Sequence, residues 1–491
     1  MKLLRLIAVM TLLAFGWTGA ASAAQEEEHS TDTSKVERKN RAPVSKDILK
    51  VTLPRATEAT LSNGLTVLIM ENHRLPLISL QYNLSAAGAI FEPSNAPGLA
   101  AITAQMLREG TSGKDSVQIA EQIDQLGASI TAAAGFGSAV TVVNASGISD
   151  NFEQWFALTN DILLNPTFPA NELNRIKQRL KTQLRQQRAN PNFLSNETFA
   201  KAVYGSHPAA VVSATPESID AFTPEMLAKW HHDRYAPQNA ILGITGDVKA
   251  SELVPKLEKW LAGWKKTDLK EELPPNPKPA ASKRVFLVNR PNSVQTTVAL
   301  GNIAIDRRDL DYIPLTVMNH LLGGGPAARL FLNLREEKGY TYGVYSTFTA
   351  LKYPGPWRAG ADVRTEVTSG AMTEFYKEFQ RIRDDKVPAG ELDEAKRALV
   401  ASFALSLESP PELLGYSIIQ KIYGFPPDYW DTYPAKIMAV TADDIQRVAR
   451  KYVNPDNLQI VAVGDIGKIK PVFEKYGPVE VFDGDGKKIG N

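Results

Sequence analysis

Histidine and cysteine, the side chains most typical of zinc sites, are few or absent in this 491-residue sequence. Six histidines and no cysteine are present, which excludes thiolate metal sites, a cysteine nucleophile and a disulfide framework. His231 and His232 form the one close histidine pair, but neighbouring helix residues point about 100° apart and do not easily chelate one ion. We expect this pair to pack at a helix end or to interact with the C-terminal dipole. Gly205-Ser206-His207 lacks the spacing of a nucleophile elbow, so independent catalysis is not expected.

The densest motif lies between Leu322 and Val344. It opens with Gly323-Gly324-Gly325, which lacks the lysine and Ser/Thr of a phosphate-binding loop. We interpret these glycines as open backbone that allows close approach of another chain. A helix is expected to follow and to end at Gly339, with a strand starting at Tyr342. Helical spacing places three side chains of this helix on a buried face: Leu330, Phe331 and Leu334.

Two blocks of the chain occur twice, in the same order and at nearly the same offset. Residues 222–248 match residues 440–466, a shift of 218, and residues 168–205 match residues 387–424, a shift of 219. The first block predicts, in each copy, a capped helix, a turn and an apolar strand that ends at Gly-Asp. The preserved offset therefore indicates an internal duplication.

The elements expected within each half are mixed helices and strands. Alternating apolar residues predict strands at residues 67–70 and 78–84. Helical spacing predicts helices at residues 119–126, 151–164 and 172–188. Because helices and strands do not alternate strictly, the sequence predicts α+β sandwich domains.

The N-terminus carries the features of a secretory signal. Basic residues precede a short apolar run at residues 6–17, and Ala21-Ser22-Ala23 supplies a small-x-small cleavage site. The run is shorter than the roughly 20 residues that a membrane span needs. We predict a signal peptide at residues 1–24, cleavage near Ala23, a flexible charged leader at residues 25–46, and a periplasmic or secreted mature protein.

The rest of the chain divides into a first domain at residues 47–264, a linker at 265–282 and a second domain at 283–491. The linker contains four prolines among charged residues and is expected to be extended. The formal net charge of +1 gives no global attraction to nucleic acid or to an anionic membrane. Neither is therefore expected as a partner.

Three segments carry a family resemblance: Leu61-Ser-Asn-Gly-Leu-Thr-Val67, Gly98-Leu-Ala-Ala-Ile-Thr-Ala-Gln-Met-Leu-Arg-Glu-Gly-Thr111 and Asn165-Pro-Thr-Phe-Pro169. With the duplication, they resemble the pitrilysin/insulinase family of zinc metallopeptidases (inverzincins), from about Leu53 to the C-terminus. The resemblance implies two homologous α/β sandwich domains, a duplicated, clam-like half-barrel arrangement joined by the Pro-rich linker.

In active members of this family the second segment carries H-x-x-E-H, in which two histidines bind zinc and the glutamate acts as general base. The corresponding residues here are Ala101, Ala104 and Gln105. Alanine has no lone pair, and a neutral amide is a poor zinc ligand. The metal-ligand and base positions are therefore lost.

The family's third zinc ligand, a glutamate, falls near Leu180, Lys181 and Thr182. No carboxylate occurs between Leu173 and Asn196. The same stretch holds six basic residues: Arg175, Lys177, Arg179, Lys181, Arg185 and Arg188. Positive charge disfavours a divalent cation. We therefore expect no metal or other cofactor in this chain and expect zinc in a partner subunit.

The resemblance also assigns a role to two residues of the second half. Family members contribute an arginine and a tyrosine seven residues apart to the active site formed by the H-x-x-E-H half, and Arg335 and Tyr342 match them by position. A guanidinium and a phenol can stabilise the negative charge that develops on a scissile carbonyl oxygen. The alternative is that Arg335 pairs with a nearby glutamate while Tyr342 packs in a sheet. Tyr340 takes a position that is more often aliphatic, and no role is assigned to it.

These features predict a non-catalytic, substrate-binding subunit of a heterodimeric zinc metallopeptidase that degrades peptides, similar to the alpha subunit of mitochondrial processing peptidase. A paralogous H-x-x-E-H subunit supplies zinc, while Arg335, Tyr342 and the glycines at 323–325 contact unfolded peptides, which bind by strand addition. Two alternatives stay open: a non-proteolytic structural or interaction protein of the same fold, and a peptide-binding homodimer.

Overall fold

The computed structural model describes residues 48–490. The predicted signal peptide and leader, residues 1–24 and 25–46, lie outside the described residues. Within the described part, no helix has the length and apolar character needed to cross a membrane.

The first half is built on a six-stranded sheet with the order β1-β2-β8-β3-β7-β6. Its strands are β1 (Thr57–Thr60), β2 (Thr66–Glu71), β3 (Leu77–Ser85), β6 (Ser129–Ala134), β7 (Val140–Ile148) and β8 (Ala240–Gly246). Strand β2 runs parallel to β8, and the other neighbours are antiparallel. The strands predicted at residues 67–70 and 78–84 are thus confirmed as the central parts of β2 and β3.

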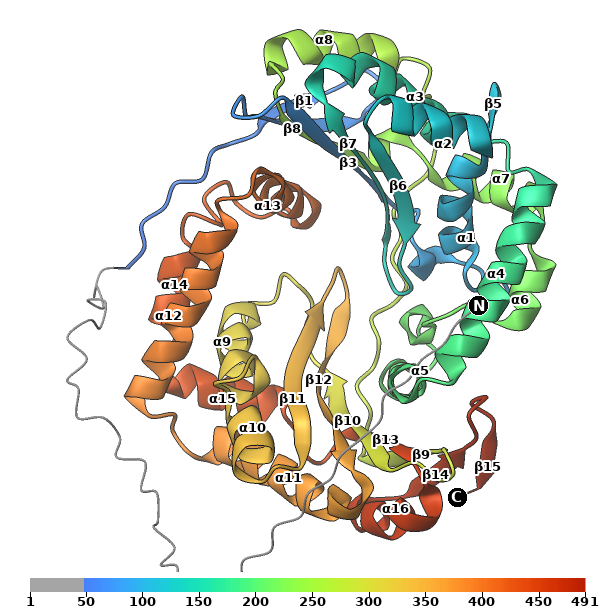
Figure 1. The fold of residues 1–491 in the computed structure, drawn as a ribbon. Helices are drawn as coiled ribbons and strands as arrows, with labels where there is room; N and C mark the ends of the chain where they lie inside the picture. The colour runs from blue at the N-terminus through green and yellow to red at the C-terminus, as the bar shows by residue number, and fades with distance from the viewer. Residues whose placement is uncertain (1–47, 491) are drawn as a thin grey trace, which may run out of the picture. The chain divides into compact units, whose positions relative to one another are not determined.

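The second half repeats this plan in a seven-stranded sheet with the order β11-β12-β10-β13-β9-β14-β15. Its strands are β9 (Arg284–Asn289), β10 (Gln295–Ile303), β11 (Thr341–Ala350), β12 (Pro354–Arg364), β13 (Gln459–Gly464), β14 (Val479–Phe482) and β15 (Lys488–Gly490). The run β9-β13-β10-β12-β11 has the same directions as β2-β8-β3-β7-β6. The duplication predicted from the repeated blocks is confirmed (Figure 1).

The helices of the first half are α1 (Leu99–Met106), α2 (Ser116–Gln125), α3 (Phe152–Leu164), α4 (Ala170–Arg188), α5 (Pro191–Tyr204), α6 (Pro216–Ala221), α7 (Pro224–Arg234) and α8 (Ala250–Trp260). The helices of the second half are α9 (Tyr312–Gly323), α10 (Arg329–Phe331), α11 (Thr368–Asp384), α12 (Ala389–Ser406), α13 (Pro410–Tyr423), α14 (Tyr433–Ala439), α15 (Ala442–Tyr452) and α16 (Ile466–Phe473). A π-helix at Leu332–Glu337 continues α10, and a small hairpin, β4 (Gly110–Thr111) and β5 (Lys114–Asp115), precedes α2.

The repeated sequence also sets the starts of equivalent helices. Thr223 caps α7 by accepting the N–H of Met226 at 3.3 Å, and Thr441, 218 residues later, caps α15 by accepting the N–H of Asp444 at 3.1 Å. Such caps satisfy backbone donors that have no partner within the helix. The predicted helix starts in both copies are therefore confirmed.

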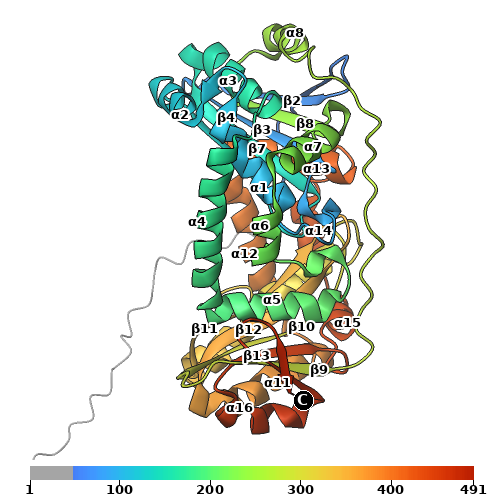
Figure 2. The ribbon, with the colours of Figure 1, turned by 90° about the vertical axis from the view of Figure 1, so that its right-hand side faces the viewer.

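Helices α5 and α13 occupy equivalent places in the two copies, offset by 219 residues, and each packs on the opposite sheet. Helix α5 lies on β10 and β13 (Figure 2). Its Phe199 joins a small apolar cluster of the second sheet. Helix α13 lies on β2 and β8, where Ile418 packs near Gly243. A Cβ at Gly301 would lie 2.1 Å from the carbonyl oxygen of Trp357 in β12 and 2.8 Å from the Phe199 ring, so glycine makes room for both the neighbouring strand and the crossing helix.

Residues 265–282, the expected linker, contain no helix or strand and pass from α8 to β9 (Figure 2). The segment is tied to both halves. Asn239 donates to the carbonyl oxygen of Leu269 at 3.0 Å, and the Lys352 ammonium lies 2.6 Å from Glu271. The linker is therefore extended but anchored.

Candidate functional site

Helix α1 carries the three positions at which the family resemblance implies metal ligands and a base. The helix begins after Gly98, whose φ of 94° is readily adopted only by glycine. The half-buried Glu92 carboxylate accepts the N–H groups of Gly98 and Ala100 at 2.8 and 2.7 Å, which holds the helix start in place. Burial raises the pKa of Glu92 to about 7. Ala104 is buried, while Ala101 and Gln105 are half-buried.

Ala104 and Gln105 line a cavity of about 620 Å³ bounded by α1, α2, β6 and α4. At the three family positions, the methyl groups of Ala101 and Ala104 and the amide of Gln105 do not fit zinc. No three His, Cys, Asp or Glu side chains within residues 48–490 are grouped so that they could hold a metal ion. Arg175 from α4 lines the cavity as expected, but its charge is balanced by Glu109 at 2.6 Å.

Lys181, a basic residue at the expected third-ligand position, forms an ion pair with a residue of another helix. Its ammonium lies 2.7 Å from the Asp220 carboxylate of α6. The positive charge of α4 is thus partly neutralised by two carboxylates of other elements, Glu109 and Asp220. The sequence of α4 alone does not predict these ion pairs. A lysine held in an ion pair is still not a zinc ligand.

His231 and His207 have structural roles. His231 is half-buried, its Nε2 lies 2.7 Å from the carbonyl oxygen of Leu163, and burial lowers its pKa to about 4. A neutral ring cannot stabilise a helix dipole as a cation, so of the two expected roles only packing remains. His207 accepts the N–H of Ala209 through Nδ1 at 3.2 Å, and burial lowers its pKa.

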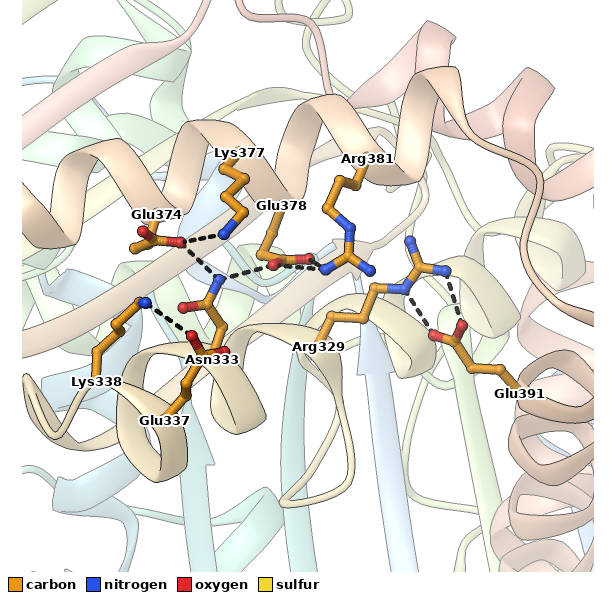
Figure 3. Close-up of polar contacts among 9 residues, drawn as sticks. All are labelled: Arg329, Asn333, Glu337, Lys338, Glu374, Lys377, Glu378, Arg381 and Glu391. Atoms are coloured by element: carbon orange, nitrogen blue, oxygen red, sulfur yellow. Dashed lines mark hydrogen bonds and ion pairs between the residues drawn. The ribbon is translucent and has the colours of Figure 1, made fainter.

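In the second half, Arg335 is carried by the π-helix, which is anchored by two carboxylates of α11. The buried Asn333 donates through Nδ2 to Glu374 at 2.8 Å and to Glu378 at 2.7 Å (Figure 3). Glu378 is 1% exposed and also pairs with Arg381 at 2.9 Å. A π-helical turn is a rare and less favourable geometry that is frequent at functional sites. This network supplies hydrogen bonds that hold it.

A second anchor lies one turn earlier. Arg329 is 8% exposed and binds the Glu391 carboxylate of α12 with two hydrogen bonds of 2.6 and 2.8 Å (Figure 3). The bidentate geometry is the strong form of an arginine–carboxylate pair. The start of the segment that carries Arg335 is therefore tied to α12 and its middle to α11.

The Arg335 side chain itself is 44% exposed. Its guanidinium lies 4.7 Å from the centroid of the Phe331 ring, and its Nε is 3.6 Å from Glu336. The expected alternative, a pair with a neighbouring glutamate, is therefore present in a long and exposed form. Such a pair contributes little and leaves donors of the guanidinium available.

Tyr342 lies at the start of β11, an edge strand that pairs only with β12. Its side chain is 89% exposed, so it does not pack in the sheet. The pairing with β12 is irregular between Thr341 and Val344, a bulge of the kind that redirects side chains at sheet edges. The predicted strand start is confirmed, and the phenol faces solvent.

Tyr342 lines a cavity of about 590 Å³ on one face of β10, β11 and β12. The opposite face of these strands packs against the hydrophobic core of the second half, called the second core below. Tyr345, Arg358 and Asp362 line the same cavity, and Asn192 of α5 closes one side. Sequence reasoning missed these residues. The signal was available in the alternation of β12, where apolar residues of the core alternate with polar or small ones.

The glycines at 323–325 differ in what requires them. A Cβ at Gly323 would lie 2.4 Å from the backbone nitrogen of Ser346, so the close approach there is that of β11 and not of another chain. A Cβ at Gly324 would meet His320, whereas nothing lies within 4 Å of one at Gly325. The interpretation as open backbone thus applies to Gly325 and not to Gly323.

Tyr340, for which the sequence assigned no role, packs against the second core. Its ring lies over Gly370 of α11, where an added Cβ would be 2.9 Å from the phenol oxygen. Its backbone N–H donates to the carbonyl oxygen of Leu334 at 2.9 Å. Tyr340 therefore helps to fix the turn between the π-helix and β11.

Comparisons with known proteins agree with this architecture. The model of the insulinase family (peptidase family M16) matches residues 85–214, and that of the peptidase M16 inactive domain matches residues 221–399. The chain is 23% identical over 351 residues to the uncharacterized zinc protease YmxG of Bacillus subtilis strain 168, which covers 71% of this chain and 84% of that protein. It is 22% identical over 408 residues to the non-peptidase homolog YmxG of Helicobacter pylori strain 26695, which covers 82% and 93%.

The crystal structure of a peptidase M16 inactive domain from Pseudomonas fluorescens is also similar. It is 30% identical in sequence with a TM-score of 0.78, and the match covers 84% of this chain and 98% of that one. The shared fold and the matched sequence models agree with the duplicated topology described above. The chain therefore belongs to the insulinase family of peptidases, peptidase family M16.

Proposed function

We propose that this chain is the non-catalytic, substrate-binding subunit of a heterodimeric periplasmic zinc metallopeptidase that degrades peptides. One observation carries the proposal. The donor pair Arg335 and Tyr342 is exposed and held on an anchored segment, in a chain whose own metal positions are two alanines and a glutamine. An anchored but unsatisfied pair of donors is what a site completed by another subunit requires.

In this proposal the partner's H-x-x-E-H helix supplies the zinc ion and the general base. The phenol of Tyr342 and the guanidinium of Arg335 donate to the carbonyl oxygen of the scissile peptide as it becomes negatively charged. Removing one donor of this kind lowers the rate by about 10²–10³-fold. The free edge of β11 offers backbone groups to which an extended peptide can pair.

The test is hydrolysis of an unstructured peptide by this chain together with an H-x-x-E-H paralogue. Each protein alone is expected to be inactive, and the mixture active. Tyr342→Phe and Arg335→Ala should each lower kcat by about 10²–10³-fold while leaving complex formation unchanged. Tyr345→Phe is the matched control, since it removes a phenol from the same strand and should change kcat less than threefold. If the mixture's activity is indifferent to both donor substitutions, the assigned roles are wrong.

The periplasmic part of the proposal is supported by the sequence signal at residues 1–24. Fractionation of cells that express the full chain, with N-terminal sequencing of the product, tests it. A mature protein that starts near Gln25 in the periplasmic fraction is expected.

A second candidate is a peptide-binding protein that takes no part in hydrolysis. The observation that favours it is the similarity to a protein described as a non-peptidase homolog. Peptide binding without stimulation of any H-x-x-E-H paralogue distinguishes this candidate from the first.

A further inference from the structure

Strand β12 divides its side chains between two environments. Trp357, Ala359 and Ala361 face the second core, whereas Arg358 and Asp362 lie on the opposite face of the sheet. Arg358 and Asp362 line the cavity that also holds Tyr342. None of the catalytic roles described above uses either residue.

Arg358 is largely withdrawn from water, yet its polar partners are neutral. Its guanidinium donates to the hydroxyl of Ser195 at 3.2 Å and to the side-chain oxygen of Asn196 at 3.3 Å, and it lies 5.2 Å from the centroid of the Phe199 ring. All three partners belong to α5. Burial lowers the pKa of Arg358, and the charge of Asp362 opposes that shift. An arginine nevertheless stays protonated at any physiological pH, so the cavity contains a fixed positive charge.

Asp362 does not neutralise this charge by direct contact. It stands four residues from Arg358 on the same strand, about 13 Å along it. Its carboxylate accepts hydrogen bonds from Thr297 and, at 3.2 Å, from Asn192 of α5. The cavity is therefore polarised, with a cation at one end and an acid satisfied by neutral donors at the other.

We propose that the cavity binds a carboxylate of the peptide substrate and that Arg358 is the residue that selects it. The side chain of Arg358 lines this cavity, and its in-register neighbours on the two adjacent strands are Gly301 and Thr347. A carboxylate can accept two parallel, charge-assisted N–H bonds from a guanidinium. The hydrogen bonds that Arg358 donates to the neutral oxygens of Ser195 and Asn196, at 3.2 and 3.3 Å, are weaker than such a pair. Tyr342 and Tyr345 at the rim provide aromatic surface for the adjoining peptide.

The negative end of the cavity gives the binding a direction. A second carboxylate placed near Asp362 would be repelled, so the favoured peptide carries one acidic group at the Arg358 end and neutral or basic groups at the other. The inference rests on the proposed function in one respect, since it takes Tyr342 to face bound peptide. It names the substrate class: peptides with an acidic side chain or a free C-terminal carboxylate.

The experiment measures binding of short peptides to the purified full chain without a partner. Four unstructured twelve-residue peptides carry a central Glu or Gln, each with a free or an amidated C-terminus. The wild-type chain is expected to bind the best carboxylate-bearing peptide at least about tenfold more tightly than the Gln, amidated peptide. The peptide that retains the preference tells whether the side chain or the C-terminus is the bound group.

Arg358→Gln should reduce this preference to about one and leave the Kd of the neutral peptide within about twofold. Arg358→Lys keeps the charge but loses the planar fork, so an intermediate preference is expected. A wild-type chain that does not prefer any carboxylate, or an Arg358→Gln chain that keeps the full preference, overturns the inference.

Arg358 also contacts α5, so two control variants test whether it acts only by holding that helix. Asn196→Ala and Phe199→Leu weaken the contacts between α5 and Arg358 but leave the guanidinium in place. The preference should persist in both variants, and its loss there would show that Arg358 acts by holding α5. Since binding is measured without a partner, a failure of the hydrolysis test with Tyr342→Phe and Arg335→Ala is distinguishable from a failure of this selectivity.

Discussion

Replacing Asn333 by alanine tests whether the carboxylates of α11 hold the π-helix that carries Arg335. The side chain of Asn333 is buried and donates one hydrogen bond to Glu378 and one to Glu374. Glu378 keeps its pair with Arg381 after the substitution, so the change does not leave an isolated buried charge. The variant therefore reports on the two lost hydrogen bonds, and it also removes the buried Oδ1 of Asn333, which has no hydrogen-bond partner among the described residues.

The magnitude follows from the environment of each carboxylate. Hydrogen bonds to charged groups contribute about 1.5–3 kcal/mol, and the bond to the fully buried Glu378 is in this class. Glu374 also interacts with Lys377, so losing its bond costs about 0.5–1.5 kcal/mol. Local opening of the π-helix is then expected to become easier by about 2–4 kcal/mol.

The assay is native-state hydrogen exchange of the amides in Leu332–Glu337. A change of about 2–4 kcal/mol corresponds to exchange that is about 30- to 1000-fold faster. Lys338→Ala is the matched control, because it removes an ion pair with Glu337 but no hydrogen bond of Asn333, and exchange should change less than about threefold. Equal exchange in wild-type protein and in Asn333→Ala would refute the idea that this network maintains the π-helix.

Two further expectations concern stability. Gly323→Ala should lower the free energy of unfolding by about 1–3 kcal/mol, because its Cβ would lie 2.4 Å from the backbone nitrogen of Ser346. Gly325→Ala, the control, should change the free energy of unfolding by less than about 0.5 kcal/mol. Equal effects of the two substitutions in denaturant titrations would contradict the close contact at Gly323. The pKa of His231 is about 4 when folded and about 6.5 when unfolded, so the unfolded chain takes up a proton first as pH falls. The free energy of unfolding should therefore be highest above pH 6.5 and fall by about 3 kcal/mol between pH 6.5 and pH 4. His231→Gln retains a donor for the carbonyl oxygen of Leu163 and should remove this part of the pH dependence. An unchanged pH profile in the variant would show that His231 is not responsible.

Much of the secondary structure could be predicted because its signals are local. The helix predicted at residues 172–188 is found as α4 (Ala170–Arg188), and the strand expected from Tyr342 is found as β11. Threonine caps and the glycine at 339 set helix ends through contacts with residues a few positions away. Repetition of such signals at a nearly constant offset also revealed the duplicated plan of the two sheets.

The candidate site was only partly predictable for the opposite reason. Arg358 donates hydrogen bonds to Ser195 and Asn196, which lie 163 and 162 residues away in the sequence. The local sequence of neither segment predicts contact with the other. The exchange of α5 and α13 between the two sheets brings these partners together. Similarly, the tight contact of Gly323 with β11 became visible only when the helix and the strand were placed side by side.

The sequence by itself determined that the three family positions on α1 carry no zinc ligand and no base, because the side chains of Ala101, Ala104 and Gln105 have the same ligand properties in any fold. It also determined the register of the repeats and the positions of Arg335 and Tyr342. Only the tertiary structure decided that Tyr342 is exposed, that Arg335 lies on a π-helix held by buried carboxylates, and that Arg358 faces a cavity. Exposure and charge balance depend on segments that meet only in the folded chain, and spacing along the sequence does not encode those meetings.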